Sequence, residues 1–266
     1  MNIKHPKKSL GQNFLNDKNI IDIIINSGNI KKNDTILEVG PGTGKLTERI
    51  LLKNPKKLIA IEKDKFLVKK LHEKFKEKIT LINDDILKID EDKFKSVKMI
   101  FFGNLPYNIS SQILVKWIRR NDLNIICKKM ILMFQKEVAD RILAQTNHKD
   151  YGRLSILSSW KLNVLKIKDI NPGSFYPKPK VKSTILLIKP KENVFKINNS
   201  KNLEHVTNVF FSQKRKMINK PLKILFKDIN KISKKFDLDL TKRPQNLNPS
   251  IYLNLCKEYE DLNQFF

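Results

Sequence analysis

Short apolar runs alternate with longer segments of mixed polarity over residues 1–190. The short runs are rich in Ile, Leu, Val and Phe, and we expect strands over 35–39, 58–62, 79–82, 97–102, 130–134 and 184–188. Between them, apolar residues recur at helical spacing over 46–52, 65–75, 109–119 and 137–144. Strands that alternate with helices predict an α/β fold with a mainly parallel sheet and right-handed crossovers.

The pattern changes after Pro190. Residues 201–266 carry helical periodicity only, for instance in NLEHVTNVFF and SIYLNLCKEYEDL. We therefore predict an α/β domain over 1–190 and a small all-α domain over 191–266. The length of 266 residues and the hydrophobic content of 40% allow a substantial core.

Neither a membrane span nor a secretory signal is expected. No stretch approaches the roughly 20 apolar residues that cross a bilayer, and the basic N-terminus lacks an apolar run. The two cysteines, Cys127 and Cys256, suggest neither a disulfide framework nor a Cys-based zinc site. The absence of a disulfide framework fits a reducing cytoplasm, so we expect a cytoplasmic location. The four histidines show no metal-ligand spacing, so we expect no metal.

The net charge of +26 favours an anionic partner, with nucleic acid first. Two features weaken this interpretation. Most basic residues are Lys in a chain that is also rich in Ile and Asn, as an AT-rich coding sequence gives, and the charge is spread along the whole chain. Charge alone therefore favours RNA or DNA only slightly.

The segment TILEVGPGTGKLTERI (35–50) predicts a strand, a glycine-rich turn and a helix. Gly40, Gly42 and Gly44 let the backbone turn tightly and approach a ligand, and the helix that follows would aim free N–H groups at it. Many turns between a strand and a helix are glycine-rich, so a purely structural role stays open for the glycines alone.

Acidic residues at the ends of the next two predicted strands strengthen the case for a nucleotide-like ligand. Glu62 follows Gly40 by 22 residues, the position where an acid binds ribose hydroxyls in such folds, and Asp84 and Asp85 end the third strand. The spacing G-x-G-x-G lacks the pyrophosphate fingerprint of NAD enzymes. It resembles instead the first motif of Rossmann-like methyltransferases, whose cofactor S-adenosylmethionine has no phosphate.

A second motif, NLPY (104–107), follows the fourth predicted strand, so Asn104 should face the same crevice. It resembles the fourth motif of methyltransferases that act on amino groups. The exocyclic amine of adenine is a poor nucleophile, because its lone pair is delocalised into the ring. Acceptors on the Asn104 side chain and the Leu105 carbonyl could bind its two protons and localise that lone pair. Pro106 would stiffen the turn and Tyr107 would stack on the base, whereas the alternative is a strand-ending turn with a core tyrosine.

From end to end, the chain resembles the rRNA adenine N6,N6-dimethyltransferases of the small ribosomal subunit. The matching segments are KKSLGQNFLND (7–17), ILEVGPGTGKLT (36–47), IEKD (61–64), NDDIL (83–87), FGNLPYNIS (102–110), MFQKEVADRI (133–142), YGRLS (151–155), FYPKPKVKSTIL (175–186) and FFSQKRKMI (210–218). The resemblance implies a Rossmann-like class I methyltransferase sheet followed by a small all-α C-terminal domain that docks on the ribosome.

The resemblance also implies a set of functional residues. The contacts to S-adenosylmethionine would come from Asn13, Leu15, Gly40, Gly42, Glu62, Asp85 and Asn104. The flipped adenine would lie between Tyr107 and Phe175, beside the catalytic turn Asn104, Leu105 and Pro106. For contacts to RNA we single out Lys178, Lys180, Lys214, Arg215 and Lys216, although a basic run such as the last three is often no more than a solvated surface.

The predicted activity is dimethylation of N6 on two adjacent adenosines near the 3′ end of 16S rRNA, with S-adenosylmethionine as methyl donor. The expected partner is 16S rRNA within a small ribosomal subunit or its precursor, and we expect a monomer that needs no metal and no membrane. One alternative is a large-subunit (23S) rRNA adenine dimethyltransferase of the antibiotic-resistance type. Another is a non-catalytic RNA-binding relative, which would have no need for the amide of Asn104.

Overall fold

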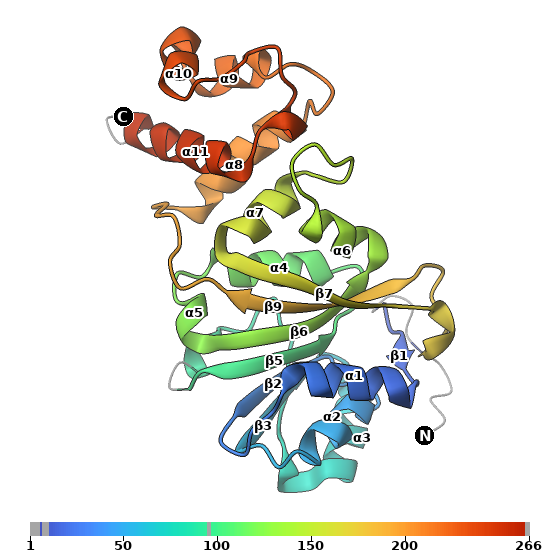
Figure 1. Cartoon of the computed structure of the whole chain (residues 1–266). Helices are drawn as coiled ribbons and strands as arrows, with labels where there is room; N and C mark the ends of the chain where they lie inside the picture. Colours follow the sequence, from blue (N-terminus) through green and yellow to red (C-terminus); the bar gives the residue numbers. More distant parts are fainter. Residues whose placement is uncertain (1–5, 7–10, 95–96, 264–266) are drawn as a thin grey trace. The chain divides into compact units, whose positions relative to one another are not determined.

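The computed structural model of the chain describes residue 6 and residues 11–94 and 97–263, and Figure 1 labels its elements. It divides the chain into two compact units. The first holds the described parts of 1–139 together with 163–190, and the second holds 140–162 together with 191–263. The chain passes from the first unit to the second after residue 190, and the segment 140–162 groups with the C-terminal helices.

The described part of the first unit is built on a seven-stranded sheet in the order β4-β3-β2-β5-β6-β9-β7. The strands from β4 to β6 are parallel, and β9 is antiparallel to β6. They span β2 (Thr35–Val39), β3 (Lys57–Glu62), β4 (Thr80–Asn83), β5 (Met99–Asn104), β6 (Cys127–Gln135), β7 (Leu162–Ile170) and β9 (Ser183–Pro190). The predicted α/β class and its mainly parallel sheet are confirmed. Strand β7 was not predicted, because its polar alternation, LNVLKIKDI, carries little apolar signal.

Helix α1 precedes the strands of this sheet in the sequence, and the other helices lie between successive strands. The helices are α1 (Lys18–Gly28), α2 (Lys45–Leu51), α3 (Lys65–Phe75), α4 (Ser110–Arg119), α5 (Leu123–Ile126) and α6 (Lys136–Leu143). The four helices predicted over residues 1–190 correspond to α2, α3, α4 and α6, each within two residues at either end. A two-stranded ribbon of β1 (Phe14–Leu15) and β8 (Phe175–Tyr176) and the 3-10 helices η2 (Lys76–Lys78), η3 (Glu91–Phe94) and η4 (Pro172–Ser174) complete the unit.

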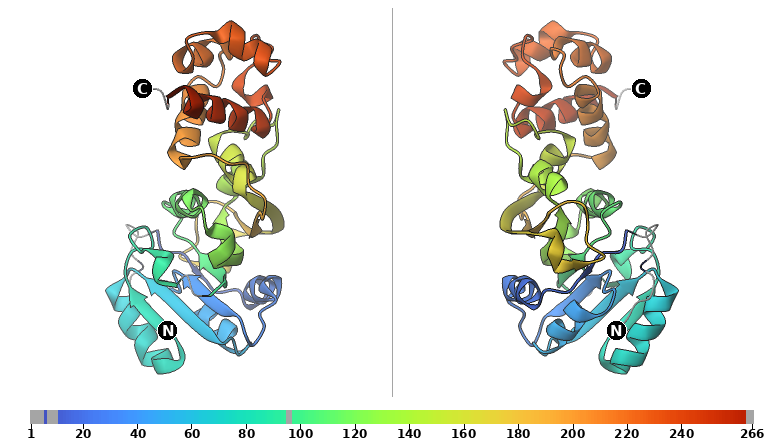
Figure 2. Two further views of the ribbon diagram at one scale, coloured as in Figure 1. Left: turned by 90° about the vertical axis from the view of Figure 1, so that its left-hand side faces the viewer. Right: turned by 90° about the vertical axis from the view of Figure 1, so that its right-hand side faces the viewer.

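The two faces of the sheet are covered by different helices. Because successive strand residues point to opposite faces, neighbours on β5 have different partners. Phe102 joins the core cluster that α1, α2 and α3 cover, and its ring takes the space where a Cβ on Gly28 of α1 would lie. Phe101 packs against Trp117 of α4 in a tilted arrangement, with ring centroids 5.1 Å apart. Figure 2 shows α1 and α4 on opposite sides of the strands.

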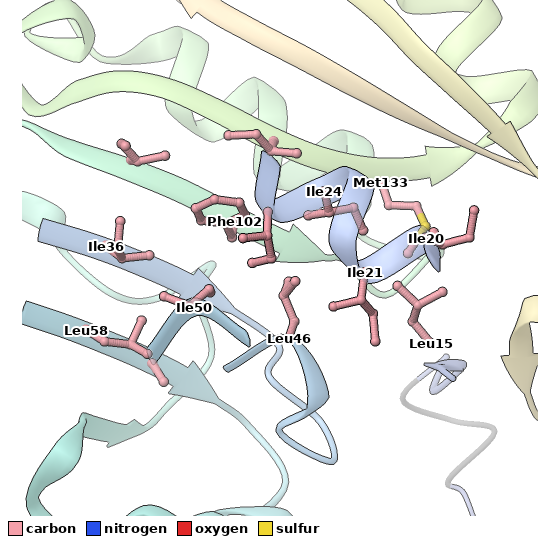
Figure 3. Packing of buried hydrophobic residues seen from close by; sticks show 14 of the residues in the cluster. Leu15, Ile20, Ile21, Ile24, Ile36, Leu46, Ile50, Leu58, Phe102 and Met133 are labelled. Carbon is pink, nitrogen blue, oxygen red and sulfur yellow. The ribbon is translucent and has the colours of Figure 1, made fainter. Parts of the chain in front are cut away.

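Helix α1 illustrates how local sequence and packing cooperate. Asp17 caps its first turn by accepting hydrogen bonds from the backbone N–H groups of Asn19 and Ile20. Its apolar stripe recurs at helical spacing and is fully buried, and it consists of Ile20, Ile21, Ile24 and Ile25. Figure 3 shows how this stripe meets side chains from β2, β5 and β6. Burial of four isoleucines is worth roughly 1.5–3 kcal/mol for each side chain.

The second unit is helical, as the sequence predicted for the chain after residue 200. Its helices are α7 (Arg153–Lys161), α8 (Ser200–Phe211), α9 (Asn219–Leu225), α10 (Ile229–Lys235), α11 (Pro249–Asn263) and the 3-10 helix η5 (Pro244–Asn246). No helix of the described residues is long and apolar enough to cross a membrane.

Aromatic packing explains why the segment 140–162 belongs to this unit. The buried Tyr151 ring lies edge-on to Phe211 of α8, with centroids 6.1 Å apart, and its hydroxyl donates to the Leu247 carbonyl at 3.0 Å. Tyr252 of α11 packs on the same Phe211 ring at 5.7 Å. The indole N–H of Trp160 in α7 donates to the Phe195 carbonyl at 2.8 Å. The segment thus supplies two large side chains to the helical core.

Candidate functional site

A cavity of about 260 Å³ lies at the carboxyl edge of the sheet, where the strand order reverses. Strand β2 pairs with β3 on one side and with β5 on the other. The chain builds outward from β2 to β4 and then returns to continue through β5 and β6. A crevice forms at such a switch point, beyond the ends of the strands. Residues that end or follow four neighbouring strands meet there, and they include Gly40, Glu62, Asp85 and Asn104.

The glycine turn between β2 and α2 requires residues without side chains. Gly40, Gly42 and Gly44 have φ angles of 70°, 58° and 76°, where L side chains are strained. A Cβ on Gly42 would lie 2.9 Å from the Phe14 ring, whereas one on Gly40 would meet only the Asn104 carbonyl oxygen, at 3.5 Å. Gly42 thus allows close packing, and Gly40 keeps part of the cavity free of side-chain atoms.

Glu62 ends β3 and ties the glycine turn to the start of α3. Its carboxylate accepts a hydrogen bond from the Gly42 backbone N–H at 3.2 Å and another from the Asp64 N–H at 2.9 Å. Burial raises the pKa of Glu62, and these hydrogen bonds act in the opposite direction. Each carboxylate oxygen can accept a second hydrogen bond. Glu62 therefore has acceptor capacity left for a ligand in the cavity that it lines.

Asp85 follows β4 and is held in place by two donors. Its carboxylate accepts hydrogen bonds from the Lys63 ammonium at 2.8 Å and from the Leu87 backbone N–H at 3.0 Å. Burial on its own would raise the pKa of Asp85, but these contacts outweigh it and the pKa is lowered. The side chain is 13% exposed and lines the cavity next to Asp84. It is thus an ionised acceptor at neutral pH.

Asn104 ends β5, and its orientation follows from one hydrogen bond. The side-chain N–H donates to the backbone carbonyl of Asn13 at 2.8 Å. Since a carbonyl can only accept, the amide nitrogen must face Asn13, and the side-chain oxygen is on the other side. Among the described residues, that oxygen accepts no hydrogen bond. Asn104 and Asn13 both line the cavity, so the structure holds a free amide acceptor there.

The turn after Asn104 is fixed at several points. Leu105 is 1% exposed, and the Pro106 carbonyl accepts from the Ile109 N–H at 3.1 Å as α4 begins. The Tyr107 hydroxyl shares a short hydrogen bond with Ser183 of β9. Burial raises the pKa of Tyr107, so the phenol is neutral at physiological pH. Leu105, Pro106 and Tyr107 all line the cavity, as their predicted roles require.

Two predicted site residues do not line the cavity. Leu15 is 6% exposed and Phe175 is 4% exposed, and both belong to the hydrophobic core cluster. They are paired directly opposite each other on the two strands of the β1–β8 ribbon. The Leu15 side chain is therefore committed to the core, so only its backbone could touch a cofactor. Stacking of a base on Phe175 stays a prediction and would require this ring to leave the position described here.

The basic residues singled out in the sequence are on the surface of their units. Lys178 and Lys180 follow β8 and are exposed. Lys214, Arg215 and Lys216 form a turn after α8 rather than a helix face. Lys214 is partly buried and donates to the Lys149 carbonyl at 2.5 Å, whereas Arg215 and Lys216 are exposed. Their contacts with RNA stay predictions.

The structure adds residues that the sequence analysis passed over. Gln12 lines the cavity, and its side chain donates to the carboxylate of Asp64, which caps α3, at 2.9 Å. Phe14 covers Gly42, and Lys63 holds Asp85. The GQNFL segment carried the signal for Gln12 and Phe14; residues 7–10, which precede it in the matching motif, lie outside the described residues. In the described chain, no group of three or more His, Cys, Asp or Glu side chains could hold a metal ion.

Glu38, the last residue but one of β2, is a buried acid close in sequence to the glycine turn. It is 1% exposed, and neither carboxyl oxygen has a hydrogen-bond partner. Burial raises its pKa to about 8; the facing Thr47 acts in the opposite direction, and nearby Glu62 adds to the rise. Glu38 is therefore protonated in the folded protein at neutral pH.

We expect Glu38→Gln to change how stability depends on pH. The folded-state pKa is raised from 4.5 to about 8, so folding of the wild type takes up a proton between these values and loses stability as pH rises. As pH rises through this window, the free energy of unfolding of the variant should increase relative to that of the wild type by up to roughly 1.4 kcal/mol per pH unit. Urea unfolding from pH 4 to 8 measures it, and the values near pH 4, where both side chains are neutral, serve as the internal reference. A difference that does not vary with pH would show that Glu38 takes up no proton.

Comparisons with known proteins agree with this architecture. The chain matches the family model described as ribosomal RNA adenine dimethylase over residues 3–261. It is 54% identical over 256 residues to the ribosomal RNA small subunit methyltransferase A of Pelagibacter ubique, covering 96% of this chain and 97% of the relative. The protein of the same name from Ehrlichia canis is 41% identical over 250 residues, covering 92% and 93%. A crystal structure of a dimethyladenosine transferase from Plasmodium falciparum superposes with a TM-score of 0.80 at 29% identity, covering 94% of this chain and 98% of that chain.

Proposed function

Since the chain belongs to the ribosomal RNA adenine dimethylase family, we propose that it dimethylates N6 of two adjacent adenosines in the loop near the 3′ end of 16S rRNA. The family resemblance seen in the sequence is confirmed by these matches. Relatives at 54% and 41% identity over more than nine-tenths of the chain are named as small-subunit methyltransferases. The observation that carries the proposal is the free side-chain oxygen of Asn104 in the cavity at the carboxyl edge of the sheet.

We propose that this cavity holds S-adenosylmethionine, which supplies a methyl group bound to a positively charged sulfur. The lining fits such a ligand because it contains three acids, Glu62, Asp84 and Asp85, and no phosphate-binding cluster. Glu62 has spare acceptor capacity for ribose hydroxyls, and Asp85 is an ionised acceptor for the adenine amine. Gly40 leaves room that any side chain would fill. Apolar side chains complete the lining, among them Val39, Ile61, Leu67, Ile86 and Leu87.

The target amine would be bound by the Asn-Leu-Pro-Tyr turn. The Asn104 oxygen and the Leu105 carbonyl would accept its two protons, which draws the nitrogen toward tetrahedral geometry and localises its lone pair. The hydrogen bond to Asn13 holds the Asn104 amide in this orientation before the substrate arrives, so little reorganisation is needed during the reaction. Tyr107 would stack on the base while its hydroxyl stays bound to Ser183.

Positioning is the main source of catalysis in this proposal. No group in the turn needs to act as a general base, because a localised lone pair can attack and lose its proton to water afterwards. A well-aligned donor and acceptor account for a large part of the barrier reduction in such bimolecular reactions. The first methylation leaves one proton on this nitrogen, so only one of the two acceptors can be satisfied when the second methyl group is transferred.

Transfer of labelled methyl groups distinguishes this activity from that of the large-subunit enzymes. Purified protein with tritiated S-adenosylmethionine is expected to label under-methylated small subunits and to leave large subunits unlabelled. Label in 23S rRNA would favour the antibiotic-resistance activity. No transfer to either subunit, with cofactor binding also absent, would favour a non-catalytic RNA-binding protein.

We further propose that the enzyme acts as a cytoplasmic monomer on 16S rRNA within a small ribosomal subunit or its precursor. The exposed turn that carries Arg215 and Lys216 supports RNA contact by the helical unit. Both cysteines are buried free thiols, which suits a reducing compartment.

The double variant Arg215→Ala, Lys216→Ala should weaken binding to small subunits and make it less sensitive to salt. Each lost phosphate contact reduces the slope of log affinity against log salt by about 0.7–0.9, so two contacts give about twice that. Filter binding at several salt concentrations measures the slope. The matched control removes two exposed lysines of α10, Lys231 and Lys234. An equal change in both variants would show that total charge, rather than this turn, governs binding.

A further inference from the structure

The β1–β8 ribbon has two faces that carry different side chains. Its strands are antiparallel, with Phe14 opposite Tyr176 and Leu15 opposite Phe175. Residues directly opposite each other in such a pair point to the same face, and successive residues point to opposite faces. Phe14 and Tyr176 therefore share one face, and Leu15 and Phe175 share the other.

Only one of these faces is turned toward the cavity. Leu15 and Phe175 are in the core cluster, whereas Phe14 lines the cavity and covers Gly42. Its cross-strand neighbour Tyr176 is 54% exposed. Among the described residues, nothing hydrogen-bonds to the Tyr176 hydroxyl or stacks on its ring. The ribbon thus presents an uncovered aromatic ring beside the cavity, but outside its lining.

The segment that follows is basic and stiff. Lys178 and Lys180 are exposed, and neither forms an ion pair within the part of the chain that the structure describes. Pro177 and Pro179 alternate with them and restrict the backbone. Two unpaired cations within four residues of an exposed aromatic ring are the elements with which proteins hold single-stranded nucleic acid, one for the phosphates and one for a base.

We propose that Tyr176 stacks on the base next to the target adenosine, while Lys178 and Lys180 bind the adjoining phosphates. This inference rests on the proposed function and specifies how the RNA is held at the rim of the cavity. A base paired in a duplex is covered on both sides by its neighbours, so the site takes an unpaired nucleotide. The ring lies outside the cavity lining, so its partner is a flanking base rather than the base that is methylated.

The test compares Tyr176→Ala with Tyr176→Phe, which keeps the ring. Loss of one stacked base should raise the Kd for under-methylated small subunits about 5- to 150-fold in the presence of S-adenosylhomocysteine. Single-turnover methylation at saturating enzyme should keep its wild-type rate, and calorimetry should show unchanged cofactor affinity. Tyr176→Phe should bind within about twofold of the wild type. As a control, Leu52→Ala removes an exposed apolar side chain just after α2, and it should have no effect.

Ultraviolet cross-linking of the wild type to the same subunits gives an independent reading. Mass spectrometry of the cross-linked peptides should find Tyr176 attached to a nucleotide beside the target adenosine. A wild-type Kd for Tyr176→Ala, or a cross-link from Tyr176 to the target base itself, would overturn the proposal. A slower single-turnover rate with unchanged Kd would also overturn it, because the ring would then act in the catalytic pocket. Failure of the proposed function has a different signature, since the wild type itself would then transfer no methyl group to small subunits.

Discussion

Asn104→Ala should lower the single-turnover rate of methyl transfer about 10²–10³-fold at saturating cofactor. This range applies to the loss of one pre-oriented hydrogen-bonding group that acts in the transition state. In the structure the Asn104 amide is held by Asn13 and keeps its oxygen free. Stacking by Tyr107 is retained in the variant, so binding of the RNA should change much less than the rate. Rapid-quench measurement with labelled cofactor reads the rate directly.

Asn108→Ala is the matched control for this experiment. Asn108 is the same residue type, on the same turn, and it lines the same cavity, but it is exposed and does not end a strand. We expect the single-turnover rate of Asn108→Ala to stay within about threefold of the wild-type rate. A fully active Asn104→Ala enzyme would show that the amide does not polarise the amine. Equal losses in both variants would point to a general disturbance of the turn.

Glu62→Ala should weaken S-adenosylmethionine binding by roughly 1.5–3 kcal/mol, the value of hydrogen bonds to a charged group. Titration calorimetry measures this. The substitution also frees the backbone N–H groups of Gly42 and Asp64, which the carboxylate now binds. A loosened glycine turn would weaken binding as well, so the loss in affinity alone does not identify the contact.

A ligand lacking the ribose hydroxyls separates the two causes. If Glu62 binds these hydroxyls, S-adenosylhomocysteine should lose most of its advantage over its dideoxy analogue in Glu62→Ala, while the wild type distinguishes the two strongly. The difference between the two ligands isolates the pairwise contact, as in a double-mutant cycle. An unchanged advantage in the variant would mean that Glu62 acts only through the turn.

The sequence predicted most of the first unit because its strands are buried on both faces. Runs such as TILEV and MILMF leave little ambiguity about the strands. The turn between β2 and α2 was predicted from its glycines, which the structure places at positive φ. Helix α1 was not predicted, since its isoleucines are nearly continuous and hide the helical stripe. Strand β7 has the opposite difficulty, because its exposed polar positions dilute the pattern.

The site was predictable where motif residues end parallel strands. Glu62, Asp85 and Asn104 converge on one cavity because the topology brings the carboxyl ends of β3, β4 and β5 together. Phe175 and Tyr176 show the limit of sequence reasoning. Which of two adjacent aromatic residues faces the core depends on the register of the β1–β8 ribbon. A shift of one residue would exchange them, and no local pattern sets that register.

The predicted domain boundary at 190 is a second case in which contacts between residues far apart in the sequence decide the structure. The segment 140–162 precedes β7, yet its Tyr151 packs on Phe211, 60 residues further along the chain. Truncation after residue 190 would therefore expose Tyr151 and Trp160 as well as remove four helices. Point substitutions on the surface of the helical unit are for this reason the cleaner probe of its role in RNA binding.

The nucleoside composition of 16S rRNA after the reaction tests the central claim most directly. Under-methylated small subunits are incubated with the wild-type protein and S-adenosylmethionine, and the rRNA is digested and analysed by mass spectrometry. The account predicts N6,N6-dimethyladenosine at two adjacent positions near the 3′ end, and a yield about 10²–10³-fold lower with Asn104→Ala in parallel reactions stopped while the wild-type product is still accumulating. Methylation at another atom or in another region of the rRNA, or an equal yield from the variant, would contradict it.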